Sequence, residues 1–136
     1  MSNSQSLAFA VASVLAEHKA QDVQVLDLRE IAGWTDFFVL GSSSSITHMR
    51  GLARFVEEYL DSEKISSLNR PVASEDESWL LMDIGDLVVH IMSKEARSFY
   101  ELEKLWYKAK AYSVSAEGST LGSAERRAES QRENRA

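Results

Sequence analysis

The sequence predicts an α/β (α+β) fold, in which helices flank a mixed β-sheet of about five strands. Two alternating apolar stretches on either side of Gly85-Asp86 predict a hairpin. The stretch Phe37–Leu40 is apolar on both faces, which predicts a buried central strand. Other segments repeat apolar residues with a helical period and predict the flanking helices. The predicted order is helix, strand, strand, helix, strand, strand, strand, helix.

The predicted hairpin lies in the stretch from Trp79 to Trp106, which reads WLLMDIGDLVVHIMSKEARSFYELEKLW. Gly85-Asp86 forms its two-residue turn, and glycine in the first place suits a type II′ turn because glycine takes a positive φ at little cost. Successive strand residues point to opposite faces. One face is then wholly apolar and is predicted to lie in the core: Leu80, Met82, Ile84, Leu87, Val89 and Ile91.

The opposite face of the hairpin mixes apolar, aromatic and ionisable side chains: Trp79, Leu81, Asp83, Val88, His90 and Met92. A half-polar sheet face that bears a tryptophan is a candidate docking surface. Asp83 and His90 stand on neighbouring strands, two residues out of register, so the two side chains can interact. Such a pair could orient a base for a nucleophile. The spacing places no hydroxyl against His90, however, and the simpler interpretation is a hydrogen-bonded surface pair.

Three helices are predicted from amphipathic periods and capping residues. They cover residues 5–20, residues 47–64 and a segment that Ser93 can cap and that runs to Lys110. The apolar stripe of the last helix is expected to pack on the sheet through Phe99, Leu102, Trp106 and Ala109. Other residues of this helix fall away from the stripe and are expected to present polar groups beside the hairpin or to be solvated: Arg97, Tyr100 and Glu103.

Further strands and loops complete the predicted sheet. Residues 22–28 alternate as a strand, and the weaker run 65–72 contains a proline that confines it to an edge or a bulge. Asp36, just before the central strand, is either catalytic or ties down its loop through backbone hydrogen bonds. The Gly/Ser run 41–45 either binds an anion at the next helix N-terminus or is a flexible connection with Ser45 as the N-cap.

Size and charge restrict the classes of protein. A chain of 136 residues without cysteine is predicted to form one domain over residues 1–112, with neither disulfides nor thiol catalysis. Residues 113–136 are small, polar and charged and predict a disordered tail. The net charge is −6, and an acidic protein is poorly suited to gripping a phosphate backbone. The N-terminus lacks a basic segment and a run long enough to span a membrane, so a cytoplasmic protein is expected.

The stretch from Trp79 to Trp106 resembles the signature of the Iojap/RsfS family, the ribosomal silencing factors. Thr35-Asp36 followed by two aromatic residues resembles a second family feature, and a polar loop with His48 resembles a third more loosely. The sequence departs from the family before Trp79, where a Glu-Gly pair is usual and Glu75 stands without the glycine. The signature positions filled here are Trp79, Asp83, Gly85, Asp86, Val88, Val89, His90, Glu95, Arg97, Tyr100, Leu102, Glu103, Leu105 and Trp106.

The resemblance implies a translation repressor that is not an enzyme. It implies binding to the large ribosomal subunit through the ribosomal protein that is fourteenth in the L series, at the face that meets the small subunit. The bound domain would block subunit joining sterically and repress translation when nutrients are short. An acidic body suits a basic ribosomal protein, with little direct RNA contact and no membrane. The expected partner-binding residues are Trp79, Leu81, Asp83, His90, Met92, Tyr100 and Glu103.

The resemblance also implies a nucleotidyltransferase-like topology, so an enzyme is weighed as an alternative. Such enzymes need an Asp-x-Asp pair and a third acid to hold metal, and no Asp-x-Asp occurs in the chain. Asp83 and Asp86 lie across a turn, and only Asp83 points to the mixed face. We therefore expect the topology without the metal site, and neither cofactor nor metal. A further alternative is a homodimeric binding module, because family members are described as homodimers.

Overall fold

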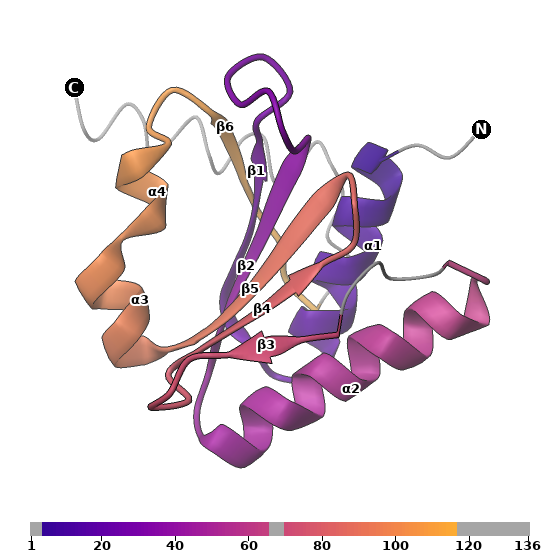
Figure 1. Cartoon of the computed structure of the whole chain (residues 1–136), viewed down its shortest axis with the longest axis vertical. Helices are drawn as coiled ribbons and strands as arrows, with labels where there is room; N and C mark the ends of the chain where they lie inside the picture. The colour runs from indigo at the N-terminus through magenta and orange to yellow at the C-terminus, as the bar shows by residue number, and fades with distance from the viewer. Residues whose placement is uncertain (1–3, 66–69, 117–136) are drawn as a thin grey trace.

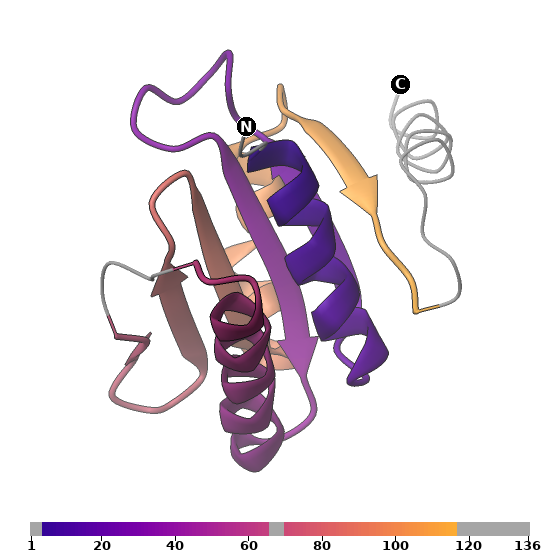
Figure 2. The same ribbon diagram turned by 90° about the vertical axis from the view of Figure 1, so that its right-hand side faces the viewer.

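The computed structural model describes residues 4–65 and 70–116 as helices that flank a six-stranded mixed sheet. Helices α1 and α2 cover one face of the sheet, and α3 and α4 lie on the other (Figures 1 and 2). This arrangement confirms the predicted α/β class, with one strand more than expected. The elements are α1 (Ser4–Glu17), β1 (Gln21–Asp27), β2 (Phe37–Ser43), α2 (Ile46–Ser62), β3 (Val72–Ala73), β4 (Trp79–Asp83), β5 (Leu87–Ser93), α3 (Lys94–Tyr100), α4 (Leu102–Leu105) and β6 (Lys110–Ser113).

The sheet is built around a parallel pair, β2 and β5, in the strand order β3-β4-β5-β2-β1-β6. Val39 lies opposite Val89 in this pair, and both side chains are fully buried. All seven residues of β2 are buried because helices cover both faces of the sheet at this strand. The prediction of a buried central strand at residues 37–40 is therefore confirmed, and the strand extends further than predicted.

The run 41–45 does not form a flexible connection along its whole length. Gly41, Ser42 and Ser43 continue β2 because their partners on β5 extend equally far, to Ser93. A Cβ atom on Gly41 would lie 3.3 Å from Cδ1 of Leu15, so glycine allows α1 to pack closely on the strand. The turn into α2 is confined to the next two residues, and Ser45 accepts a hydrogen bond from the backbone N–H of His48. The prediction of Ser45 as N-cap is confirmed.

The predicted core face of the hairpin forms one side of the main hydrophobic core. Its six residues, from Leu80 to Ile91, are all buried together with the inner faces of α1 and α2. The hairpin register pairs Leu80 with Ile91 and Met82 with Val89, which confirms the two-residue turn at Gly85-Asp86. Gly85 has a φ of 102°, and the backbone N–H of Ile84 donates to the carbonyl of Leu87 at 2.9 Å.

The prediction of a single helix over residues 93–110 is wrong. Helix α3 begins at Lys94 after the Ser93 cap and ends at Tyr100, because Glu101 adopts a left-handed conformation with a φ of 48°. The short α4 follows, and the chain then forms β6, which pairs antiparallel with β1 and satisfies the backbone groups of that strand. Phe99 was expected to pack on the sheet, but its side chain is 79% exposed. The chain changes direction at Glu101, and Lys110, the last residue of the expected helix, begins the sixth strand instead.

The predicted C-terminal boundary and the predicted weak strand at 65–72 lie near or partly on residues that the structure does not describe. Strand β6 ends at Ser113, and Val114 is buried against the core, so the folded part extends past the expected boundary at residue 112. The tail from residue 117 onward lies outside the described residues, and its disorder remains a prediction. The weak strand at 65–72 falls partly on residues 66–69, which are also outside; Val72 begins the two-residue edge strand β3.

Replacing Gly85 with alanine is expected to lower the free energy of unfolding by about 1–2 kcal/mol, because a Cβ atom at positive φ is strained. Urea denaturation of the purified protein measures this change. Asp86→Ala is the matched control, since Asp86 is the exposed neighbour in the same turn and does not have a positive φ. Equal losses in the two variants would contradict the turn assignment.

Candidate docking surface

Trp79 stands at the start of β4, on the sheet face that α3 and α4 cover in part. Its side chain is half-buried, and its indole Nε1–H donates a hydrogen bond to Nδ1 of His90 at 3.0 Å. The indole also contacts the ring of Tyr100, with centroids 4.8 Å apart. Trp79 is therefore held from two sides, by a buried ring on β5 and by an exposed ring on α3.

His90 and Met92 were predicted to lie on the docking face, but neither side chain lies on the outer surface of the protein. Met92 is fully buried and His90 is 4% exposed, because Ala96 and Leu102 pack over this part of the sheet. Neither side chain can touch a partner unless α3 and α4 move. Met92 belongs to a second hydrophobic core between the sheet and the last two helices, and the ring of His90 contacts Phe38 of this core. The alternation of the hairpin alone did not predict this core.

The Asp83–His90 pair does not form. Asp83 is half-buried, and its Oδ1 accepts a hydrogen bond from the backbone N–H of Gly85 at 3.0 Å. The imidazole Nδ1 accepts from Trp79 instead. Asp83 thus stabilises the hairpin turn, and His90 fixes an aromatic side chain, so the base-orienting constellation is absent.

The buried imidazole of His90 remains neutral near neutral pH. Burial, followed by the positive charge of Arg97, lowers its pKa from 6.5 to about 4. Because Nδ1 accepts a hydrogen bond from the indole, the neutral ring carries its proton on Nε2. Among the described residues, Nε2 has no hydrogen-bond partner. The edge-to-face contact with Phe38, with centroids 4.5 Å apart, packs the ring from the other side.

The accessible part of the predicted surface comprises Trp79, Leu81, Asp83 and Tyr100. Tyr100 is 47% exposed, and its ring meets that of Phe99 at 4.9 Å. We call Trp79, Tyr100 and Phe99 the aromatic surface. Phe99 was missed because the helical stripe assigned it to the core. The side chain of Glu103 lies outside the described part of the structure, so its expected role stays a prediction.

Arg97 joins α3 to the sheet and is 7% exposed, rather than solvated. Its guanidinium donates to Oγ of Ser42 at 3.2 Å and to the backbone carbonyl of Asp22 at 2.8 Å. These bonds reach the end of β2 and the start of β1, so they fix the helix that carries Tyr100. Helical periodicity predicted only that this side chain lies outside the apolar stripe, and it did not predict its burial. The presence of an arginine at this position of the family signature was the available indication of a specific role.

A second group of aromatic side chains adjoins the aromatic surface through the buried rings. Trp34, in the loop before β2, is 63% exposed and lies 5.7 Å from Phe38. Phe38 also meets Trp106 edge to face at 5.8 Å and contacts His90. Exposed rings therefore lie at both ends of a continuous series of ring contacts on this side of the sheet.

The contacts of Asp36 favour a role in fixing the loop before β2 over a catalytic role. Its Oδ2 accepts a hydrogen bond from Oγ of Ser4 at 3.0 Å, and its backbone N–H donates to the carbonyl of Asp86 at 2.8 Å. The neighbouring Thr35 hydroxyl donates to the same carbonyl at 3.1 Å. Asp36 thus links the start of α1 and the hairpin turn to the loop before β2.

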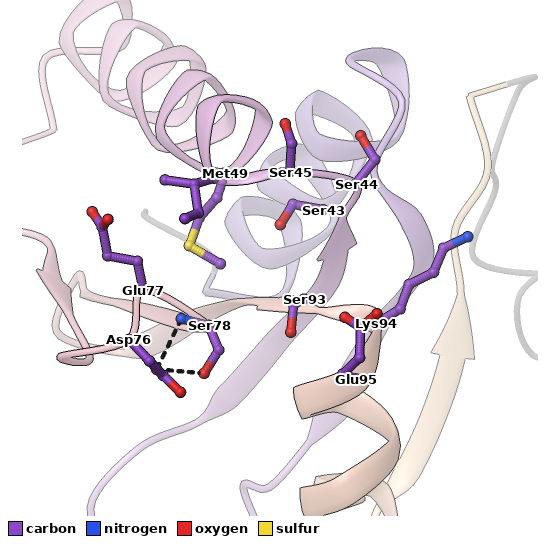
Figure 3. Close-up of a pocket in the computed structure, with 11 residues that line it drawn as sticks. Ser43, Ser44, Ser45, Met49, Asp76, Glu77, Ser78, Ser93, Lys94 and Glu95 are labelled. Atoms are coloured by element: carbon purple, nitrogen blue, oxygen red, sulfur yellow. Dashed lines mark hydrogen bonds between the residues drawn. The ribbon is translucent and has the colours of Figure 1, made fainter.

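A cleft of about 370 Å³ lies where α2 and α3 begin, next to the ends of β2 and β5 (Figure 3). The hydroxyl of Ser43 points into it, whereas the Lys94 side chain extends away. Carboxylates of Asp76, Glu77 and Glu95 line the cleft, and Glu77 is paired with Arg50. The carboxylates of Asp76 and Glu95 oppose the binding of an anion here, so the structure does not favour the anion interpretation of the Gly/Ser run.

Within the described parts of the chain, no group of three or more His, Cys, Asp or Glu side chains is placed to hold a metal ion. The helices described there also lack the length and apolar character needed to cross a bilayer.

The stability of the protein is expected to fall between pH 6.5 and about 4, where an unfolded His90 takes up a proton and the folded ring does not. The contribution of the neutral ring is fully present above pH 6.5 and is lost as the pH falls. At pH 4.5 the loss should be about 2 kcal/mol. Urea denaturation at pH 7 and 4.5 measures this loss of unfolding free energy. In His90→Asn the loss should be smaller by about 2 kcal/mol, because the titrating imidazole is absent. The same pH dependence in both proteins would contradict the buried neutral ring.

Removing Arg97 should loosen α3. Arg97→Ala is expected to lower the free energy of unfolding by about 3 kcal/mol, because the bonds to Ser42 and to the Asp22 carbonyl are lost. Lys94→Ala, at an exposed position of the same helix, should change it by less than about 0.5 kcal/mol. Thermal and urea unfolding measure both variants. An Arg97→Ala protein as stable as Lys94→Ala would show that the buried guanidinium does not hold the helix.

The chain matches known proteins of one family. Residues 1–136 match the family model described as ribosomal silencing factor during starvation, RsfS. The chain is 31% identical over 104 residues to ribosomal silencing factor RsfS of Bacillus subtilis, covering 76% of this chain and 87% of that protein. It is 36% identical over 100 residues to RsfS of Treponema pallidum, covering 73% and 88%.

Similarity extends to an organelle protein and to solved structures. The chain is 35% identical over 107 residues to chloroplastic protein Iojap of Zea mays, covering 76% of this chain and 45% of that protein. A crystal structure from Bacillus halodurans matches with a TM-score of 0.63 and 33% identity, over 76% of this chain and 95% of that one. The signature from Trp79 to Trp106, the fold and these relatives agree: the chain belongs to the family of ribosomal silencing factors.

Proposed function

We propose that this protein binds the large ribosomal subunit and represses translation by keeping the small subunit from joining. The aromatic surface carries this proposal, because Phe99 and Tyr100 are 79% and 47% exposed and form ring contacts that continue to Trp79, and clustered exposed rings are typical of docking surfaces. Family membership supports the ribosome as the target. A mouse relative, 34% identical over 96 residues, is named mitochondrial assembly of ribosomal large subunit protein 1; the match covers 69% of this chain and 42% of that protein.

The chemistry of the surface favours a protein partner over RNA. The chain carries a net charge of −6, and phosphate groups would be repelled by it. Asp83 lies at the other end of β4 from Trp79, and the exposed Glu101, which is paired with Lys104, follows Tyr100. Exposed aromatic rings on a protein of net negative charge suit a basic protein surface. The partner we propose is the ribosomal protein that is fourteenth in the L series, at the face of the large subunit that meets the small one.

The proposed mechanism is steric and needs no reaction. A folded domain seated on the joining face would occupy the space that the small subunit requires, so joined ribosomes would not form. The sheet suits this role because its β2–β5 pair is buried on both faces and presents Trp79 from a rigid neighbour, β4. Repression when nutrients are short would then depend on how much of the protein is present. The family description, which refers to starvation, supports this condition.

Trp79→Ala is expected to weaken binding to the purified large subunit by about 30-fold, or about 2 kcal/mol, because the half-buried indole is the largest ring of the aromatic surface and is held in one orientation by His90 and Tyr100. Binding is measured by titrating labelled protein with large subunits. Phe55→Ala is the matched control: Phe55 is 38% exposed, but it lies on α2 on the opposite side of the sheet. Its binding should match that of the wild type.

The outcomes separate docking from misfolding and from self-association. Circular dichroism and thermal unfolding check that both variants are folded. A folded Trp79→Ala protein that binds as tightly as the wild type would contradict the proposed surface. A second copy of the chain could also cover the aromatic surface, and sedimentation equilibrium over a range of concentrations would show a dimer that Trp79→Ala disrupts.

A further inference from the structure

We propose that His90 is a positioning residue: it orients the Trp79 indole on the aromatic surface without itself touching the partner. This inference rests on the proposed docking function and assigns a reason for the pairing of a surface tryptophan with a buried histidine. His90 belongs to the central strand β5, whereas Trp79 belongs to β4 near the sheet edge. The fixed strand therefore determines where the outer ring stands.

The hydrogen bond gives the indole one defined orientation. Trp79 lies opposite Met92 in the ladder, so His90 is its diagonal neighbour, at a separation that large rings can span. The indole Nε1–H donates to Nδ1 at 3.0 Å, with ring centroids 5.7 Å apart. An indole has a single N–H donor, so this bond restrains which edge of the ring faces the sheet and which edge faces outward.

The imidazole is itself held in place from the opposite side. Phe38 of β2 meets the His90 ring edge to face, with centroids 4.5 Å apart. The ring lies between Phe38 and Trp79, and its 4% exposure leaves it no room to contact a partner directly. A rigid acceptor behind an accessible tryptophan lowers the ordering cost of binding, because the indole does not have to be fixed when the partner arrives.

Core stability does not explain a histidine at this position. The Nε2 atom is buried and has no hydrogen-bond partner among the described residues. A buried polar group without a partner lowers stability, and an apolar side chain of similar shape would avoid that loss. Residues that break a packing rule in this way are expected at functional sites. The bond to Trp79 is the compensating interaction that the structure shows.

Two substitutions of His90 separate the effect of the hydrogen-bond acceptor at Nδ1 from the effect of side-chain shape. Leucine and asparagine both branch at Cγ, so each places one δ atom near the position of the histidine Nδ1 and the other near Cδ2. Asparagine places a carbonyl oxygen where Nδ1 stands, whereas leucine places a methyl group there. His90→Asn can therefore accept the indole hydrogen bond, and His90→Leu cannot, although the two side chains have similar size.

The experiment measures the indole and the binding separately. Heteronuclear NMR of the full chain resolves the indole N–H of each tryptophan, and Trp79→Ala assigns its signal. His90→Leu should shift this signal and speed its exchange with water, whereas His90→Asn should keep it protected. Titration with purified large subunits should show about tenfold weaker binding for His90→Leu, and binding within about threefold of wild type for His90→Asn. Thermal unfolding should show His90→Leu to be at least as stable as His90→Asn.

The outcomes distinguish failure of the positioning role from failure of the proposed function. If His90→Leu binds as tightly as the wild type while Trp79→Ala does not, the positioning role is wrong and the docking surface stands. If both His90 variants lose binding equally with folding retained, the acceptor at Nδ1 does not matter and the positioning role is again wrong. If wild-type protein fails to bind the large subunit, the proposed function is wrong. The indole signal then still shows whether His90 fixes Trp79.

Discussion

The in-register parallel pairing of β2 with β5 positions the other strands and the helices. Every other layer is placed by this pair: α1 and α2 cover one face, and α3 and α4 lie on the other. Phe38 and His90 come from its two strands and form the packed base beneath Trp79. The outer hairpin strand, the buried arginine and the aromatic surface all take their positions from these two strands.

The same arrangement explains how a buried face can support an accessible site. The hairpin face expected to be open is covered in its β5 half, at His90 and Met92, and remains accessible in its β4 half, at Trp79, Leu81 and Asp83. Arg97 holds α3 where it covers the first half and presents Tyr100 beside the second. The surface is therefore a composite of strand and helix rather than one face of the sheet.

Local patterns predicted the parts that depend on local chemistry. Alternation and the Gly-Asp turn predicted the register of the hairpin and its buried face, and Ser45 was predicted as a cap from its place before an amphipathic period. The helix break at Glu101 was missed because the apolar stripe continues through it. Strand β6 was missed because four residues with one buried tyrosine carry too little period, and only the edge of β1 makes them a strand. The burial of His90 and Arg97 depends on where α3 packs, which periodicity cannot locate.

Sedimentation of purified small and large subunits, at a magnesium level that permits association, would measure whether the protein prevents subunit joining. Added protein is expected to travel with the large subunit, and the peak of joined ribosomes is expected to shrink as free subunits accumulate. Joined ribosomes that form to the same extent, with the protein bound to neither subunit, would contradict the proposed function.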